Sequence, residues 1–117
     1  MDGPPLVSVG LPTFNRAALL KRAIESVLAQ DYSNLELIIS DNGSPDETQQ
    51  VCEEFCARDS RVKYIRQLSN RGPRANFLEV LHQARGEFFV CLGDDDWLDS
   101  SYISLCTQKL MENADYS

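Results

Sequence analysis

The sequence lacks the features that would place it in several common functional classes. It has a single histidine, His82, and none of its four cysteines forms a Cys-x-x-Cys pair, so a zinc site is not expected. Lys and Arg number 11 against 18 Asp and Glu, for a formal net charge of −7. Nucleic acids and anionic membranes bind basic surfaces, so neither is expected as a direct partner. No apolar run is long enough to cross a bilayer, and the N-terminus has no signal-peptide pattern.

The cysteines are expected to be free, buried thiols rather than disulfides or metal ligands. Cys52 and Cys56 are one helical turn apart on a face predicted to be apolar, and a buried free cysteine behaves as a small hydrophobic residue. Free thiols suit a reducing compartment. Together with the missing signal-peptide pattern they predict a cytoplasmic protein, whose membrane association, if any, would come from parts outside this chain.

Segments with the pattern of strands alternate along the chain with segments with the pattern of helices. Hydrophobic residues make up 43% of it, which is enough for one small domain over residues 1–117. The predicted strands are 6–11, 35–40, 62–66 and 87–92, and the predicted helices are 16–30, 46–58, 74–84 and one that begins near residue 100. This alternation predicts an α/β fold of the Rossmann-like type, with a mostly parallel sheet and helices on both faces.

Single residues indicate where several of these elements begin and end. Pro12 is expected to stop the first strand, because proline cannot donate to a strand ladder, and Asn15 is expected to cap the first helix. Gly86 is the type of residue that follows a helix end. The third helix is expected to point its apolar side chains into the core, namely Leu78, Leu81 and Ala84.

Three consecutive carboxylates, Asp94–Asp96, follow directly after the apolar run 88–92. Right-handed crossovers place the strand-to-helix loops of a parallel sheet at its carboxyl edge, where open α/β folds bind ligands. Adjacent carboxylates repel one another unless a cation lies among them, and a divalent cation with oxygen ligands is the natural candidate. The loops expected to converge at this edge are 12–15, 41–46, 67–76 and 93–98.

Two common nucleotide-binding patterns are absent after the first strand. A dinucleotide-binding fold would have Gly-x-Gly-x-x-Gly there, and a phosphate loop would have Gly-Lys-Ser/Thr, whereas this sequence has Pro12–Asn15. A receiver domain would have acids there too, but here they follow the second and fourth strands. Asp41 could accept hydrogen bonds from a nucleotide base. A second carboxylate could accept them from the ribose hydroxyls. A cation, with Arg71 or Arg74, would bind a diphosphate.

Four motifs, in this order, resemble those of family 2 glycosyltransferases with the GT-A fold. They are residues 11–16 (Leu-Pro-Thr-Phe-Asn-Arg), 26–32, 36–48 and 86–96, the last ending in Gly-Asp-Asp-Asp. The resemblance covers almost the whole chain. It implies an inverting transferase that uses a nucleotide-diphosphate sugar donor and Mg²⁺ or Mn²⁺. The acceptor would be a hydroxyl of a saccharide or a lipid-linked saccharide.

The resemblance also implies which residues bind the nucleoside. By their positions in the motifs, Thr13, Phe14 and Asn15 would hold it together with Asp41, and Asp94 would face the ribose. For Asn15 this role can coexist with a helix cap.

The metal and diphosphate ligands are implied in the same way. Asp95 would bind the metal as part of an Asp-x-Asp-type motif, with Asp96 as its partner. Many family members have an acid at the position of Gly93, so Asp94 remains an alternative to Asp96. Arg74 and Asn76 lie where family members contact the diphosphate, although an ordinary surface position is the alternative for Arg74.

A complete family member is longer than this chain and includes an acceptor region and a carboxylate that acts as general base. The carboxylates that follow Trp97 are Asp99, Glu112 and Asp115, and the resemblance gives none of them that role. We therefore expect the donor-binding part of a catalytic domain, inactive by itself.

Two other functional classes compete with this interpretation. A non-catalytic binding or assembly module would use a bare sheet edge to recruit a second copy, which predicts a homo-oligomer without nucleotide binding. A nucleotidyltransferase would share the sheet and the metal, but it would need a Gly-rich basic loop after the first strand, which this sequence does not have.

Overall fold

The computed structural model describes residues 4–112, in which four strands alternate with four helices. The strands are β1 (Val7–Thr13), β2 (Leu35–Asp41), β3 (Val62–Arg66) and β4 (Phe88–Cys91). The helices are α1 (Ala17–Leu28), α2 (Thr48–Arg58), α3 (Pro73–Gln83) and α4 (Tyr102–Glu112). All three strand pairs are parallel, in the order β3-β2-β1-β4. The predicted α/β fold is confirmed; the last residues, 113–117, and Asp115 with them lie outside the described part.

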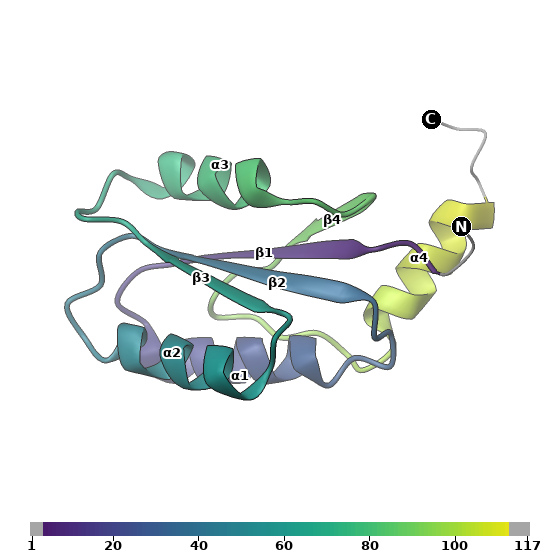
Figure 1. Ribbon diagram of the computed structural model, residues 1–117, viewed down its shortest axis with the longest axis horizontal. Coiled ribbons are helices and arrows are strands. Elements are labelled where there is room, and N and C mark those ends of the chain that lie inside the picture. Colours follow the sequence, from purple (N-terminus) through teal and green to yellow (C-terminus); the bar gives the residue numbers. More distant parts are fainter. Residues whose placement is uncertain (1–3, 113–117) are drawn as a thin grey trace.

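Helices cover both faces of this sheet, as predicted. Figure 1 shows α1 and α2 together on one face, α3 on the other, and α4 beyond the end of the sheet at which β1 begins. The two central strands, β1 and β2, are covered on both faces, and nearly every residue of each is buried. Among the described residues, no helix combines the length and the hydrophobicity that a bilayer crossing requires.

The main core lies between the sheet and α1. Leu20, Ile24 and Val27 of α1 are fully buried, and so are Leu11 of β1 and Ile39 of β2. The three helical residues are spaced by four and three positions, which places them on one face of the helix. This apolar face holds α1 against the two central strands.

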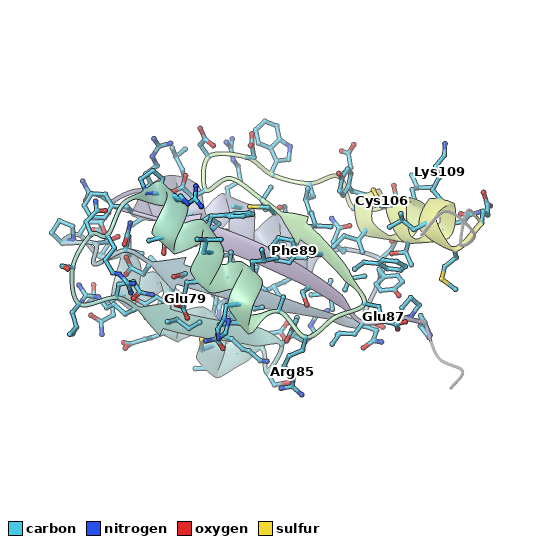
Figure 2. The ribbon with its side chains drawn as sticks, turned by 90° about the horizontal axis from the view of Figure 1, so that it is seen from above. Glu79, Arg85, Glu87, Phe89, Cys106 and Lys109 are labelled. Carbon is cyan, nitrogen blue, oxygen red and sulfur yellow. The ribbon has the colours of Figure 1, made fainter. Side chains whose placement is uncertain are left out.

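A second, thinner apolar layer lies on the opposite face of the sheet, where a single helix covers it. Phe89 extends from β4 toward α3 (Figure 2). Its ring meets that of Phe77 of α3 edge to face, with 6.3 Å between the ring centroids. The contact holds the edge strand β4 and helix α3 together.

Strand β1 continues through Pro12 to Thr13, so the prediction that Pro12 ends it was wrong. β1 pairs with β2 over its whole length but with β4 only as far as Gly10. The Gly10 carbonyl accepts a hydrogen bond from Leu92 on the β4 side, and alternate residues of a parallel strand face the same neighbour. The Pro12 nitrogen therefore faces the side that β4 has already left, where a missing N–H costs no ladder bond.

Asn15 does not cap α1, contrary to expectation. The residue before the helix is Arg16, and Asn15 has a left-handed backbone with φ of 57°, a conformation that asparagine tolerates better than most residues. The cap comes from another loop, because Oδ2 of Asp46 accepts a 3.2 Å hydrogen bond from the Ala17 N–H. Local sequence could not reveal a cap that lies so far along the chain.

Gly86 is required by close packing rather than by a helix end. Helix α3 ends at Gln83, and the Gly86 N–H donates a 2.7 Å hydrogen bond to Oγ of Ser8. A Cβ atom at Gly86 would lie 2.6 Å from the Leu6 carbonyl oxygen. A side chain at this position would push the chain away from β1.

The inward face of α3 also differs from the prediction. Asn76 and Val80 are the buried residues of the helix, whereas Leu78 and Leu81 are 45% and 44% exposed and Ala84 is half-buried. The apolar spacing was misleading because a polar residue, Asn76, occupies the inner face nearest the carboxyl edge of the sheet.

All four cysteines are free, as expected, but only one is fully buried. Cys52 is buried in the core, Cys56 and Cys106 are half-buried, and Cys91 is exposed. Burial raises the pKa of the Cys52 thiol, which therefore stays protonated and apolar in character. The cytoplasmic location inferred from these thiols stays a prediction.

Candidate functional site

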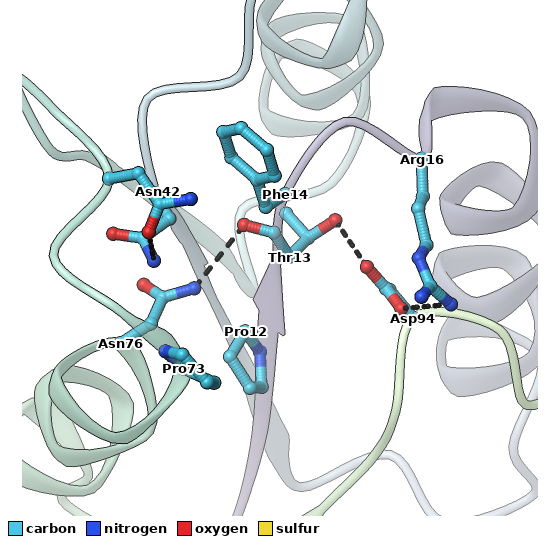
Figure 3. Close-up of a pocket in the computed structure, with 9 residues that line it drawn as sticks. Pro12, Thr13, Phe14, Arg16, Asn42, Pro73, Asn76 and Asp94 are labelled. Carbon is cyan, nitrogen blue, oxygen red and sulfur yellow. Dashed lines mark hydrogen bonds and ion pairs between the residues drawn. The ribbon is translucent and has the colours of Figure 1, made fainter.

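The loops that follow the strands meet at the carboxyl edge of the sheet around a hollow of about 340 Å³. Its walls come from the end of β1, from the loops after all four strands and from the start of α3. Figure 3 shows most of the lining residues. The lining residues are Pro12, Thr13, Phe14, Arg16, Asn42, Asn70, Pro73, Asn76 and Asp94. Four of the predicted site residues, Thr13, Phe14, Asn76 and Asp94, are thus brought together.

Thr13 connects three of these walls. Its hydroxyl donates a 2.9 Å hydrogen bond to Oδ2 of Asp94 (Figure 3). Its carbonyl oxygen accepts hydrogen bonds from the Asn42 N–H at 3.0 Å and from Nδ2 of Asn76 at 3.2 Å. Because Thr13 is itself buried, it fixes the relative positions of the walls more than it offers a free polar group.

The next two residues differ in how they meet the hollow. Phe14 lines it and is 37% exposed, which leaves part of its ring open to a ligand. Asn15 is exposed but is not among the lining residues. Its N–H donates a 2.7 Å hydrogen bond to Oγ of Ser44, which ties the loop after β1 to the loop after β2.

Asp41 ends β2 and has no exposed surface. Its Oδ1 accepts hydrogen bonds from the N–H and the hydroxyl of Ser44 at 2.9 and 2.6 Å. Its Oδ2 accepts one from the Tyr64 hydroxyl at 2.6 Å and lies 3.6 Å from Nε of Arg66. Burial and the Asp41 carboxylate raise the pKa of Tyr64, so the phenol keeps the proton that it donates. Contact between Asp41 and a base stays a prediction, and it requires Tyr64 or Ser44 to move.

The acidic loop holds its carboxylates at different depths. The Asp94 side chain is 14% exposed and that of Asp95 is 54% exposed. Nη1 of Arg16 lies 3.6 Å from Oδ1 of Asp94 and 3.4 Å from Oδ2 of Asp95. Two carboxylates on separate residues therefore converge on one cationic nitrogen.

The carboxylate oxygens of this loop suit a divalent cation, although few of them converge. Within residues 4–112, no group of three or more His, Cys, Asp or Glu side chains is arranged as a metal site. Two converging carboxylates are nevertheless what Mg²⁺ commonly uses when phosphate and water complete its shell. Oδ1 of Asp95 and Oδ2 of Asp96 lie 3.2 and 3.1 Å from the place where a Cβ of Gly93 would be. Which of Asp94 and Asp96 joins Asp95 stays open.

The two residues expected near a diphosphate behave differently. Arg74 is exposed near the start of α3 and does not line the hollow. Asn76 lines it, but its amide is occupied, because Oδ1 accepts a 2.6 Å hydrogen bond from Ser40 and Nδ2 donates to Thr13. Their contacts with phosphate stay predictions.

Two residues that line the hollow, Arg16 and Asn42, were not among the predicted site residues. Asn42 is buried, and its amide oxygen accepts a 3.0 Å hydrogen bond from the Arg71 N–H. Its Nδ2 donates to Oδ1 of Asn70 at 2.9 Å and to the Gly72 carbonyl at 3.1 Å. Asn42 thereby holds the loop after β3 against the site. Both residues lie inside motifs quoted above, but Asn42 was assigned only to the loop 41–46 and Arg16 only to the start of the helix 16–30.

Comparison with known proteins gives the family. The family model described as glycosyl transferase family 2 matches residues 8–117. The chain belongs to this family. It is 44% identical over 109 residues to a Campylobacter jejuni GalNAc(5)-diNAcBac-PP-undecaprenol beta-1,3-glucosyltransferase, covering 92% of this chain and 35% of that protein. It is 41% identical over 96 residues to the putative colanic acid biosynthesis glycosyl transferase WcaA of Escherichia coli, covering 82% of this chain and 34% of that one.

Solved glycosyltransferase structures have the same fold. S. aureus TarS 1–349 in complex with UDP-GlcNAc has a TM-score of 0.86 and 25% identity, over 92% of this chain and 32% of that one. The Pyrobaculum calidifontis mannosyltransferase PcManGT, in complex with GDP-Man and Mn²⁺, has a TM-score of 0.74 and 26% identity, over 80% and 28%. The GT-A fold is confirmed. The chain spans about a third of the length of the C. jejuni and E. coli relatives.

Proposed function

We propose that this family 2 domain binds a nucleotide-diphosphate sugar together with Mg²⁺ or Mn²⁺. The complete protein would transfer the sugar, with inversion, to an acceptor hydroxyl. The observation that carries the proposal is the hollow at the carboxyl edge, with the open ring of Phe14 and the carboxylate of Asp94 both in its lining. The UDP-GlcNAc in the TarS structure and the GDP-Man with Mn²⁺ in the PcManGT structure support it.

The nucleoside would bind against Phe14 and Asn42. An exposed aromatic face stacks on a planar base regardless of which base it is, which fits a donor whose base is not assigned. Asp41 would accept a hydrogen bond from the base once Tyr64 or Ser44 releases one of its oxygens. Asp94 would face the ribose, with its carboxylate held in place by Thr13.

The diphosphate would lie beside the acidic loop. Asp95, with Asp94 or Asp96, would hold the cation, which would screen the negative charge that develops on the departing nucleoside diphosphate. Arg16 lines the hollow and Arg74 lies near the start of α3, and guanidinium groups bind phosphate in a bidentate manner.

The general base and the residues that bind the acceptor would lie outside this chain. After Trp97, the described part contains two carboxylates, Asp99 and Glu112, and neither lines the hollow. An acceptor hydroxyl on a lipid-linked saccharide is supported by the name of the C. jejuni relative. The domain alone would then bind donor without transferring it to an acceptor.

Mapping of backbone amide shifts by NMR tests the location of the donor site. We expect UDP with Mg²⁺ to shift amides in loops 12–16, 41–44, 70–76 and 93–96, and to leave α4 unchanged. Shifts confined to other parts of the chain would contradict the proposed site. The same titration with other nucleoside diphosphates would identify the base.

Self-association is a second candidate function, favoured by one observation. β4 is the last strand in the order β3-β2-β1-β4, and a bare strand edge can pair with another copy. Light scattering over a range of concentrations tests this. A dimer that forms without any nucleotide binding would favour the assembly module, whereas a monomer that binds nucleotide would exclude it.

A further inference from the structure

Arg16 supplies the positive charge that lies between the carboxylates of the acidic loop. Its Nη1 is 3.4 Å from Asp95 and 3.6 Å from Asp94, and its side chain is 51% exposed. Arg16 directly precedes α1 and lines the hollow. A single guanidinium thus lies between the carboxylates of Asp94 and Asp95, which are one of the two pairs that could hold the divalent cation.

Other residues of α1 and its C-terminal end hold the same loop without using its carboxylates. Nη2 of Arg22 donates to the Asp95 carbonyl at 3.3 Å, and its guanidinium lies 4.1 Å from the centre of the Trp97 ring. Oγ of Ser26 accepts a 3.0 Å hydrogen bond from the Leu98 N–H. Nε2 of Gln30 donates a 2.5 Å hydrogen bond to the Asp99 carbonyl. The path of the loop is therefore set independently of Arg16, whose ion pairs can open while the loop stays in place.

We propose that Arg16 is a built-in counter-cation that competes with the divalent cation for Asp94 and Asp95. When the cation binds, Arg16 is released into the hollow, where it binds the donor's diphosphate. The Arg16 guanidinium is half exposed and lies 3.4 Å or more from either carboxylate, and ion pairs of this kind are weak. A freed guanidinium is well suited to phosphate. This inference rests on the proposed function, because it needs the metal and the diphosphate.

Mn²⁺ binding without nucleotide tests the competition, with unbound Mn²⁺ measured by electron paramagnetic resonance. We expect Arg16→Gln to bind Mn²⁺ about two- to fivefold more tightly than the unmodified chain, the range that weak ion pairs allow. Lys21→Gln is the matched control, because it removes the same charge from an exposed position of α1. It should change Mn²⁺ affinity by less than about 1.5-fold, since screening weakens distant surface charges.

The proposed contact between Arg16 and the diphosphate predicts the opposite effect on UDP affinity in the same variant. At saturating Mn²⁺, Arg16→Gln should bind UDP about three- to tenfold more weakly, as expected for the loss of one charged phosphate contact. Hydrogen exchange of residues 94–98 should be unchanged, because Arg22, Ser26 and Gln30 hold the loop. If Arg16 has only a structural role, Arg16→Gln should instead accelerate this exchange and weaken the binding of both Mn²⁺ and UDP.

The outcomes separate this inference from the proposed function. Mn²⁺ binding that is lost in Asp95→Asn but is unchanged or weaker in Arg16→Gln would overturn the competition and leave the metal site standing. UDP binding that is unaffected by Arg16→Gln would overturn the release toward the diphosphate. If neither the unmodified chain nor Arg16→Gln binds Mn²⁺, both the inference and the metal part of the proposed function are wrong.

Discussion

The hydroxyl of Thr13 donates a 2.9 Å hydrogen bond to Oδ2 of Asp94, which lies 81 positions later in the chain. The bond joins the end of the central strand β1 to the acidic loop after the edge strand β4. It uses one oxygen of Asp94, while the other lies near Arg16. The first and last loops of the sheet thus form a single wall of the site.

Replacing Thr13 by valine should weaken donor binding more than it weakens the fold. Valine keeps the shape and removes the hydroxyl, which leaves a partly buried carboxylate oxygen without its donor. We expect a loss of about 1 kcal/mol in unfolding free energy and about five- to tenfold weaker binding of UDP with Mn²⁺. Urea unfolding and calorimetry measure the two effects. Thr13→Ser keeps the hydroxyl and should retain most of the affinity; equal losses in both variants would contradict the role of this bond.

Phe14 should contribute to nucleotide affinity without contributing to phosphate affinity. Stacking of a base on an aromatic ring is worth about 1–3 kcal/mol, so Phe14→Ala should weaken UDP binding by at least about fivefold. Phe14→Tyr keeps the ring and serves as the control. Inorganic pyrophosphate with Mn²⁺ should bind equally to all three proteins. A parallel loss of pyrophosphate binding in Phe14→Ala would show that the ring supports the loop instead of the base.

Glu36 should stabilise the fold only above mildly acidic pH. Burial alone would raise its pKa, but hydrogen bonds from Ser8 at 2.6 Å, from Lys63 at 2.9 Å and from the Arg85 N–H at 2.8 Å outweigh this and lower the pKa. A carboxylate whose pKa is lower in the folded state stabilises that state above its unfolded pKa of about 4.3. The stabilisation is lost as the pH falls through the folded-state pKa.

Glu36→Gln isolates this contribution. We expect it to be less stable than the unmodified chain by about 1.5–3 kcal/mol at pH 7, the range for hydrogen bonds to a charged group. The difference should shrink between about pH 5 and pH 3, as measured by urea unfolding at each pH. Asp46 and Asp59 also have lowered pKa values, but they are present in both proteins and cancel in the difference. A gap that does not vary with pH would contradict the assignment.

Asp46 should stabilise the starts of two helices at once. Its Oδ2 accepts a hydrogen bond from the Ala17 N–H at 3.2 Å, and its Oδ1 accepts one from the Thr48 N–H at 3.0 Å. Asp46→Ala removes both and should cost about 1–2 kcal/mol, as a lost helix cap does. Asp46→Asn keeps one acceptor and should lose less. Thermal unfolding measures both, and equal losses would argue against capping.

The general fold could be predicted because its signals are repeated along the chain. Each strand includes apolar residues, and acidic residues mark where two of the strands end: Asp41 is the last residue of β2, and Asp94 follows shortly after β4. The errors concern positions where distant segments meet. The cap of α1 is Asp46 and not Asn15. Glycine is required at position 86 because the chain there approaches the Leu6 carbonyl closely.

The candidate site was predictable in its location but not in its internal bonds. Parallel topology places the loops after the strands at one edge, which is why Thr13, Phe14 and Asp94 line one hollow. The burial of Asp41 behind Tyr64 depends on side-chain packing across loops, and so does the approach of Nη1 of an arginine before α1 to the acidic loop. No local pattern records such contacts.

Calorimetric titration of UDP, with and without Mn²⁺, tests the proposed donor site most directly. The chain is compared with Asp95→Asn and with Asp31→Asn, an exposed position that removes the same charge outside the hollow. We expect UDP binding that requires Mn²⁺, is lost in Asp95→Asn and is unchanged in Asp31→Asn. Binding that is independent of Mn²⁺ and equal in all three proteins would contradict a metal-dependent donor site at the acidic loop.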